Sequence, residues 1–351
     1  MNPLALSLLI AVGCNHQAKP PKPVQPVAEQ PKPKASALLR YSNRDFKWGF
    51  LDQKFGIVIP AKYDNAEPFS EGLSAVMLNG KSGFIGADGK IAVPFRYDEV
   101  GSFSEGMAAV VIGEKVGYID KTGREVVPPQ YELFDDEVLA PFDSFHDGMA
   151  CVRKGKLYGF VDKSGKLAIP LQFDRQTTFS NGYAAAERGT QKGYIVSTGN
   201  FFCTGDWDPE GPFSEGLAAV RKGSKVGYVD ITGKVIIDFK FEGGMPFHAG
   251  VAAASSGNKL GFIDKSGKWV IQPQFLASLD SGEDICGQFK ENLCWVRNTD
   301  DRIGFIDRTG KVIVPFKFDA AWDYSNGLAL VWMGAQCGYI DTSGKFVWAS
   351  K

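Results

Sequence analysis

The chain has 351 residues, of which 44% are hydrophobic and 23% are charged, so it can bury a substantial core. Its 39 Lys and Arg against 40 Asp and Glu give a formal net charge of −1, which excludes a strongly basic nucleic-acid-binding protein. With only 3 His, the chain has few residues for a multi-histidine metal site or for histidine-based catalysis.

The first residues have the features of a secretory signal. They are apolar from Leu4 to Val12, a run shorter than the roughly 20 residues of a membrane-spanning helix but typical of a signal-peptide hydrophobic region. Small residues precede Cys14, which resembles the lipobox of bacterial lipoproteins. The resemblance implies a lipoprotein signal peptide over residues 1–13 and lipidation of Cys14. Asn15, where Asp would favour the inner membrane, implies the outer membrane. The alternative is an incidental thiol in a plain signal peptide.

Residues 14–36 are predicted to form a stalk. The segment 15–36 holds six Pro and four Lys against one Glu, with no apolar repeat from which to build a core. Proline-rich chain prefers polyproline II, which rises ~3.1 Å per residue, so the segment would reach on the order of 70 Å. Such a stalk would hold a folded domain away from a membrane.

Residues 37–351 are predicted to form one repeat domain. A glycine followed by an aromatic residue, Ile or Val recurs every 34 residues, except for two intervals of 42 and 43. These marker glycines are Gly49, Gly83, Gly117, Gly159, Gly193, Gly227, Gly261, Gly304 and Gly338. A fixed period of this length is typical of a repeat architecture and removes the case for several domains.

Each repeat is predicted to hold three strands and no helix. In the copy around Gly227, short β-branched and small residues form the segments 217–220, 226–229 and 235–237. The second segment contains the marker glycine, which indicates a close approach of another backbone. An Asp-x-x-Gly sequence at 230–233 predicts a turn in which Asp accepts backbone hydrogen bonds and Gly takes a positive φ.

The recurring sequences Lys-x-Gly-aromatic-Ile-Asp-x-x-Gly-Lys and Phe-Ser-Glu-Gly-Leu-Ala-x-Val resemble the bacterial WG (KWG) repeat proteins. The resemblance covers residues 37–351, although the Trp that names the family stands only at Trp48, before Gly49. It implies a β-repeat fold with a role in adhesion or interaction, and it brings no catalytic residues.

Two arrangements of the nine repeats remain open. Propellers usually have 4–8 blades, so we expect the all-β domain to be an open superhelical β-stack of nine three-stranded repeats. The alternative is a closed propeller-like ring completed by the N-terminal strand. In that case Ala37–Arg40 would serve as a third strand, and the chain would close at Phe346–Trp348.

The third and seventh repeats carry insertions of about eight residues, within Leu133–Ser144 and Leu276–Gln288. Insertions of repeat proteins map to loops that are often the binding face. The candidate binding residues are Asp135, Asp136, Glu137 and Asp143 in the first insertion, and Asp280, Glu283 and Asp284 in the second. The other interpretation is that both are tolerated surface insertions.

Cysteines and one acidic loop complete the candidate features. Cys286 and Cys294 flank the second insertion closely enough to staple it, whereas Cys151 and Cys337 replace Ala or Val of other repeats and are expected to be buried thiols. The loop 206–211 begins like a calcium loop, but Leu217 stands where the bidentate acid is needed. We therefore expect no metal site and no cofactor.

The sequence favours a non-catalytic, membrane-tethered, extracytoplasmic scaffold of the bacterial cell envelope, lipid-anchored in the outer membrane. Its expected partner is an envelope protein or a glycan, with no nucleic acid. The alternative is a cell-wall or glycan-binding protein, with or without glycan processing, in which aromatic side chains stack on sugars. The tryptophans considered for that role are Trp207, Trp269, Trp295, Trp322 and Trp348.

Overall fold

The computed structural model describes residues 38–134, 141–277, 286–334 and 336–349. These residues form 32 strands and no helix, which confirms the all-β prediction. The chain divides into two units, Met1–Lys32 and Pro33–Lys351, and every described residue belongs to the second unit. The predicted signal peptide and stalk lie outside the described residues. No helix of membrane-spanning length and hydrophobicity occurs in the described part of the chain.

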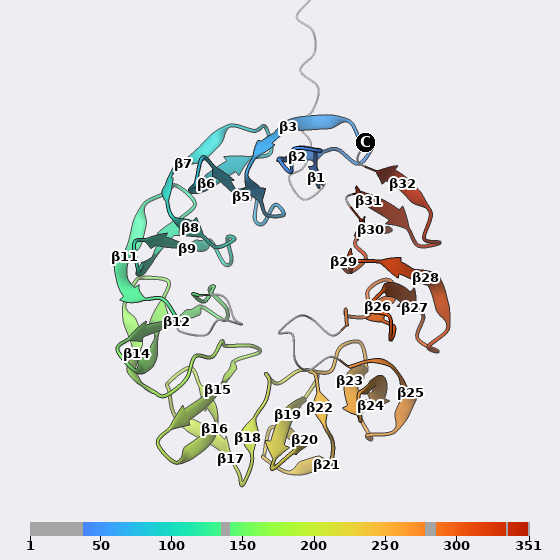
Figure 1. Cartoon of the computed structure of the whole chain (residues 1–351). Helices are drawn as coiled ribbons and strands as arrows, with labels where there is room; N and C mark the ends of the chain where they lie inside the picture. Colours follow the sequence, from blue (N-terminus) through green and yellow to red (C-terminus); the bar gives the residue numbers. More distant parts are fainter. Residues whose placement is uncertain (1–37, 135–140, 278–285, 335, 350–351) are drawn as a thin grey trace, which may run out of the picture. The chain divides into compact units, whose positions relative to one another are not determined.

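The second unit consists of nine small antiparallel sheets, named here blades 1 to 9, which follow chain order around a ring (Figure 1). Seven of them are separate sheets, and blades 3 and 4 are joined by the pair Glu132 and Arg153 into one sheet of seven strands. Blade 1 holds β1 (Leu39–Ser42), β2 (Trp48–Leu51) and β3 (Ile57–Tyr63); blade 2 holds β4 (Asn65–Ala66), β5 (Leu73–Leu78), β6 (Lys81–Gly86) and β7 (Ile91–Tyr97); blade 3 holds β8 (Glu99–Val100), β9 (Met107–Ile112), β10 (Lys115–Asp120) and β11 (Glu125–Glu132).

The remaining blades repeat this plan along the chain. Blade 4 holds β12 (Met149–Lys154), β13 (Leu157–Asp162) and β14 (Leu167–Phe173); blade 5 holds β15 (Tyr183–Arg188), β16 (Gln191–Val196) and β17 (Phe201–Thr204); blade 6 holds β18 (Asp208–Pro209), β19 (Leu217–Lys222), β20 (Lys225–Asp230) and β21 (Val235–Phe241). Blade 7 holds β22 (Gly243–Gly244), β23 (Val251–Ser256), β24 (Lys259–Asp264) and β25 (Trp269–Leu276); blade 8 holds β26 (Cys294–Arg297), β27 (Ile303–Ile306) and β28 (Val312–Phe318); blade 9 holds β29 (Ala320–Ala321), β30 (Leu328–Met333), β31 (Gln336–Asp341) and β32 (Phe346–Ala349).

Five blades contain one strand more than the three that were predicted. Blades 2, 3, 6, 7 and 9 begin with a fourth strand of two residues, β4, β8, β18, β22 and β29. A pair of residues is too short for the alternation of apolar and polar side chains that identifies a strand in a sequence.

The marker glycines lie where the second and third long strands of a blade cross closely. A Cβ added to Gly117 would lie 2.4 Å from the carbonyl oxygen of Val127, and one added to Gly227 would lie 2.6 Å from that of Ile237. The strand register shifts at both points. No side chain fits between the two backbones, which confirms the close approach predicted from the glycine period.

The Asp-x-x-Gly turns also form as predicted. Asp120 accepts hydrogen bonds from the backbone N–H of Thr122 at 2.9 Å and of Arg124 at 3.2 Å, and Gly123 has a φ of 82°. The Thr122 hydroxyl donates a further bond at 2.6 Å, and this bond and that of the Arg124 side chain lower the pKa of Asp120 to about 2. The Asp therefore holds the turn together in its charged form.

The core lies between neighbouring blades rather than inside one. At each of eight interfaces, the aromatic residue directly after the marker glycine packs on an aromatic residue in a loop of the next blade. The ring centroids lie 4.6 to 5.1 Å apart. The pairs are Phe50–Phe69, Phe84–Phe103, Tyr118–Phe145, Phe160–Phe179, Tyr194–Phe213, Tyr228–Phe247, Phe262–Phe289 and Phe305–Tyr324.

The Phe-Ser-Glu-Gly sequence links one blade to the next. The hydroxyl of Ser104 donates to the carbonyl oxygen of Phe145 at 2.6 Å, and Glu105 accepts a bond from the N–H of Gly148 at 2.8 Å. Matching bonds join other neighbouring loops, and we call the series the loop ladder. It comprises the bonds Ser70–Phe103, Ser104–Phe145, Ser214–Phe247, Glu71–Gly106, Glu105–Gly148, Asp147–Gly182, Glu215–Gly250 and Glu291–Gly327.

The ring is closed by contacts between blades 9 and 1. The hydroxyl of Tyr339 in β31 donates to the carbonyl oxygen of Arg40 in β1 at 3.1 Å, as Tyr194 does to Ala219 of the next blade at 3.4 Å. The rings of Tyr41 and Trp348 meet edge to face with centroids 5.9 Å apart. The expectation of an open stack is therefore wrong, and the closed ring is the arrangement found.

The N-terminal strand does not complete another blade's sheet. β1 pairs with β2 in the register Leu39 to Leu51, so it is the inner strand of blade 1 rather than the third strand of a missing repeat. β32 pairs only with β31 among the described strands and ends blade 9. Every blade is thus made of consecutive residues, and the ring closes through side chains and the Tyr339 hydroxyl.

Candidate functional site

The interface between blades 9 and 1, called the seam here, departs from the other eight. Leu39 pairs with Leu51 as Ser74 pairs with Ile85 in blade 2, so residues 34–37 correspond to the Phe-Ser-Glu-Gly sequence at 69–72. That stretch reads Lys-Ala-Ser-Ala and contains no aromatic residue. Tyr339 therefore has no loop aromatic of the usual kind as its partner. It packs instead near Phe55 and Trp348, with centroids 6.4 and 6.3 Å away.

A cavity of about 790 Å³ lies at the seam, larger than two others of about 620 and 240 Å³ in the described part of the chain. Blade 9 lines it with Trp322, Asn326 and Tyr339, and blade 1 with Gln53 and Phe55. We call it the seam cavity. A large concave site with aromatic walls and a few polar groups is the usual form of a ligand pocket.

The seam cavity combines an exposed aromatic face with polar side chains. Trp322 is 43% exposed, and Asp323 and Asn326 follow it along the lining. Arg40 also lines the cavity, but its guanidinium is held by the carbonyl oxygen of Ala66 at 2.9 Å. No His or Cys is among the described lining residues. The arrangement suits binding of a polar ligand with an apolar face.

Of the seven predicted acidic binding residues, only Asp143 lies among the described residues. The other six, Asp135, Asp136, Glu137, Asp280, Glu283 and Asp284, lie outside the described residues, and the two insertions remain the predicted alternative to the seam cavity as the binding surface. Asp143 is buried at 8% exposure and joins three parts of the ring. Its carboxylate accepts bonds from the N–H of Cys151 and the hydroxyl of Thr178, both at 2.8 Å, and its carbonyl oxygen accepts one from Tyr118 at 2.9 Å. This position gives Asp143 a structural role.

Burial raises the pKa of Asp143 from 3.8 to about 6. The folded chain thus holds this proton over a pH range in which the unfolded chain has lost it, so stability falls as pH rises from about 4 to 6. We expect the wild type to lose on the order of 3 kcal/mol of unfolding free energy over that range through this group, and Asp143→Asn to lack that loss. Urea unfolding at pH 4, 5 and 7 measures it, and identical pH profiles for both proteins would contradict the assignment.

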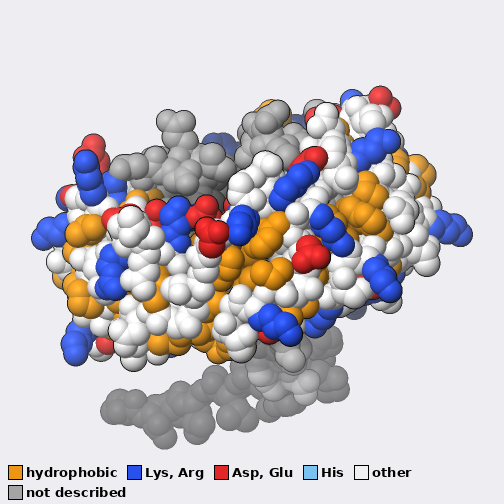
Figure 2. Space-filling view, turned by 90° about the horizontal axis from the view of Figure 1, so that it is seen from below, with side chains coloured by type: hydrophobic (Ala, Val, Ile, Leu, Met, Phe, Trp, Pro, Cys, Tyr) orange, Lys and Arg blue, Asp and Glu red, His pale blue; other side chains and the backbone are white. Residues whose placement is uncertain are grey.

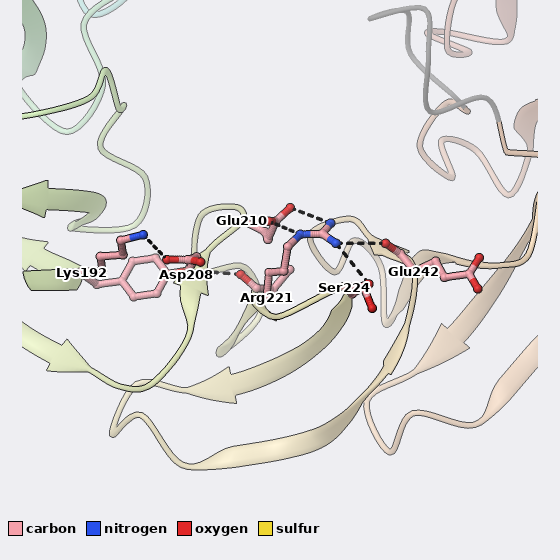
Figure 3. Close-up of polar contacts among 8 residues, drawn as sticks. Lys192, Asp208, Glu210, Arg221, Ser224 and Glu242 are labelled. Carbon is pink, nitrogen blue, oxygen red and sulfur yellow. Dashed lines mark hydrogen bonds and ion pairs between the residues drawn. The ribbon is translucent and has the colours of Figure 1, made fainter. Parts of the chain in front are cut away.

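The acidic loop 206–211 is part of a set of ion pairs shown in Figure 3. Asp208 pairs with Lys192 of blade 5 at 2.7 Å, and Glu210 holds the Arg221 guanidinium at 2.5 and 3.2 Å. Asp206 pairs with Lys222 at 3.0 Å. Each carboxylate thus has a different basic partner, and no group of three or more His, Cys, Asp or Glu in the described ranges is placed to hold a metal ion.

Two of the tryptophans expected to stack on sugars have no exposed ring face. Trp207 and Trp295 are buried, at 7% and 6% exposure, whereas Trp322 is the exposed one and lies at the seam. The sequence pattern of the repeat did not distinguish the buried tryptophans from the exposed one. The signal that could have identified the seam was the absence of an aromatic residue at positions 34–37.

The five cysteines in the described part of the chain are buried thiols, as predicted for Cys151 and Cys337. Cys286 and Cys294, predicted to staple the second insertion, form no disulfide in the structure.

The part of the outer rim seen in Figure 2 carries a mixture of charged and hydrophobic side chains. Figure 2 shows Lys and Arg interspersed with Asp and Glu over this part of the rim, with hydrophobic side chains between them. Exposed hydrophobic residues of the outermost strands include Phe202, Ile236 and Val270, at 37%, 41% and 48% exposure. Apolar residues scattered among charges are common on protein surfaces.

Comparison with known proteins agrees with the fold. The family model of the WG containing repeat matches residues 48–81, 83–115, 117–158, 158–189, 211–225, 227–259, 261–276 and 303–334. No curated protein sequence matches the chain.

Solved structures resemble the chain at low sequence identity. A crystal structure of the eukaryotic initiation factor has a TM-score of 0.59 and 11% identity, with 90% of this chain and 96% of that chain covered. The extracellular domain of a one component system from B. thetaiotaomicron has a TM-score of 0.41 and 10% identity, with 87% and 52% covered. Streptogramin B lyase has a TM-score of 0.37 and 15% identity, with 68% and 90% covered. At such identities the first likeness concerns the fold alone. The family model covers most of the ring, and the chain belongs to the family of proteins with the WG containing repeat.

Proposed function

We propose that the protein is a non-catalytic binding scaffold of the bacterial cell envelope, and that the seam cavity is its ligand pocket. The observation that carries the proposal is the contrast between the interfaces. Eight of them repeat the same aromatic pair, whereas the described residues of the ninth contain no such pair and line a cavity of about 790 Å³. Repeat positions serve packing against both neighbours, so a ligand site is expected where the repeat is broken.

We propose a non-catalytic role because the recurring polar residues of the repeats make structural hydrogen bonds. The Glu and Ser of the loop ladder bind the next blade, and the Asp of each Asp-x-x-Gly turn binds its own turn. A glycoside hydrolase needs two carboxyl groups about 5 to 9.5 Å apart across a cleft. The seam cavity has one carboxylate, Asp323, among its described lining residues.

The envelope location is part of the proposal and rests on the N-terminal sequence. A lipid on Cys14 would anchor the chain in the outer membrane, and the proline-rich segment 14–36 would hold the ring away from the bilayer. Its partner would then be an envelope protein or a glycan.

A glycan is the second candidate ligand, and the exposed Trp322 favours it. The apolar faces of sugars stack on aromatic rings, while amide and carboxylate groups bind their hydroxyls. Asn326 and Gln53 line the same cavity, as does Asp323, whose carboxylate accepts a hydrogen bond from the N–H of Gln288 at 3.1 Å. An envelope protein would use the same aromatic residue as an anchor.

Replacement of Trp322 by Ala is expected to weaken ligand binding by about 30-fold or more, the usual effect of removing an aromatic anchor. The matched control is Phe46→Ala, because Phe46 is 65% exposed and does not line the cavity. A glycan array and capture from solubilised envelope fractions measure the effect and also separate the two ligand classes. Equal binding by wild type and Trp322→Ala would refute the seam cavity as the pocket.

A further inference from the structure

Three sulfur atoms meet at the interface of blades 7 and 8. The thioether of Met245 lies 4.0 Å from the thiol of Cys286, and Cys286 and Cys294 belong to one buried hydrophobic cluster on which Met245 packs. Cys286 pairs with Val296 in an antiparallel bridge, so it lies on the same face of the strand pair as Cys294, two residues before Val296. The register of the strands therefore places the two cysteines as diagonal neighbours on one face of the strand pair.

The two cysteines are buried, and Met245 and Cys286 border a cavity. Cys286 and Cys294 are 5% and 1% exposed, and Met245 packs on the same hydrophobic cluster. A cavity of about 240 Å³ is lined by Met245, Cys286 and His248, with Phe262 and Phe289 as apolar walls. This cavity gives a small ion a place beside Met245 and Cys286.

We propose that Met245, Cys286 and Cys294 form a binding site for a soft monovalent metal ion, Cu(I). Thiolate and thioether ligands select Cu(I) over hard cations. Three ligands at a metal–sulfur distance of about 2.3 Å in trigonal geometry lie about 4 Å apart, which is the separation of the Met245 and Cys286 sulfurs. Zinc favours four ligands, usually Cys, His or carboxylate, and no described cluster of three or more His, Cys, Asp or Glu is present.

Binding involves proton release and no electron transfer. Each thiol that becomes a thiolate ligand loses one proton to solvent, copper stays in its +1 state, and the Met245 thioether donates as a neutral group. This site is independent of the seam cavity.

Other blades supply substitutions that are compatible with the fold. The position of Cys294 is Ala218 in blade 6 and Ala252 in blade 7, and the position of Cys286 is Ala66 in blade 2. Cys294→Ala and Cys286→Ala thus copy residues that the repeat already accepts. Met245→Leu keeps the volume and removes the sulfur. Cys151→Ala, which copies Ala219, is the matched control because it removes a buried thiol elsewhere.

The experiment titrates the reduced full-length chain with Cu(I) under anaerobic conditions against a chromophoric Cu(I) chelator. We expect one Cu(I) per chain, with copper–sulfur distances near 2.3 Å in X-ray absorption. Cys286→Ala and Cys294→Ala should each lower the affinity on the order of 100-fold, Met245→Leu about 10-fold, and Cys151→Ala not at all. The proposal is overturned if the chelator takes all the copper from wild type or if the cysteine variants bind as wild type does. It is equally overturned if the chain isolated from its own cells carries a complete Cys286–Cys294 disulfide.

Discussion

Replacement of Gly117 by Ala is expected to lower the free energy of unfolding by more than about 3 kcal/mol, in the range that marks a steric clash in a core. The added Cβ would lie 2.4 Å from the carbonyl oxygen of Val127, 2.6 Å from the nitrogen of Pro129 and 2.9 Å from the carbonyl carbon of Pro128. All three atoms belong to the backbone of β11, so no flexible side chain can move to make room. Urea unfolding followed by tryptophan fluorescence measures the loss.

Gly106→Ala is the matched control for this prediction. Gly106 has a φ of 83°, and no atom lies within 4 Å of an added Cβ. Its replacement should cost only the strain of a left-handed residue, about 1–2 kcal/mol. If both substitutions cost the same, the period of the marker glycines reflects backbone conformation rather than the crossing of two strands.

Replacement of Cys14 by Ala is expected to release the protein from membranes. Stable anchoring of a lipoprotein needs more than one acyl chain, and all of them depend on that cysteine. The measurement is fractionation of cells after a salt wash, together with metabolic labelling by a fatty acid. Wild type should be labelled and sediment with the outer membrane, whereas Cys14→Ala should carry no label and appear in the soluble fraction.

The control for the anchor is Cys151→Ala, which removes a buried thiol of the ring and should leave fractionation unchanged. Fatty-acid labelling that persists in Cys14→Ala would place the lipid elsewhere. Loss of the label with unchanged sedimentation would show that the ring itself binds membranes.

Most of the local structure could be predicted from the sequence, because it depends on features that recur every 34 residues. Glycine at positions 117 and 227 indicates a close approach of two backbones, and Asp120 followed by Gly123 indicates a turn, because few other conformations need these residue types there. The two-residue strands were missed because a segment such as Asn65–Ala66 is too short to show a period.

The closure of the ring was not predictable from the repeat. It depends on a small rotation between neighbouring blades summed over nine blades, and no single repeat determines that sum. The burial of Asp143 was missed for a related reason. Its partners Thr178 and Tyr118 lie 35 and 25 residues away, in neighbouring blades, so the sequence shows only an acid in an insertion.

The measurement that tests the account most directly compares the seam with the two acidic insertions in one capture experiment. Wild type, Trp322→Ala and two variants lacking residues 135–140 or 278–285 are immobilised, and envelope proteins and glycans retained by each are quantified. Removal of either short segment changes loop-closure entropy by under about 1 kcal/mol, so the ring should stay folded. The account predicts that Trp322→Ala loses the ligand while both deletions retain it. Retention by Trp322→Ala together with loss in either deletion would contradict it.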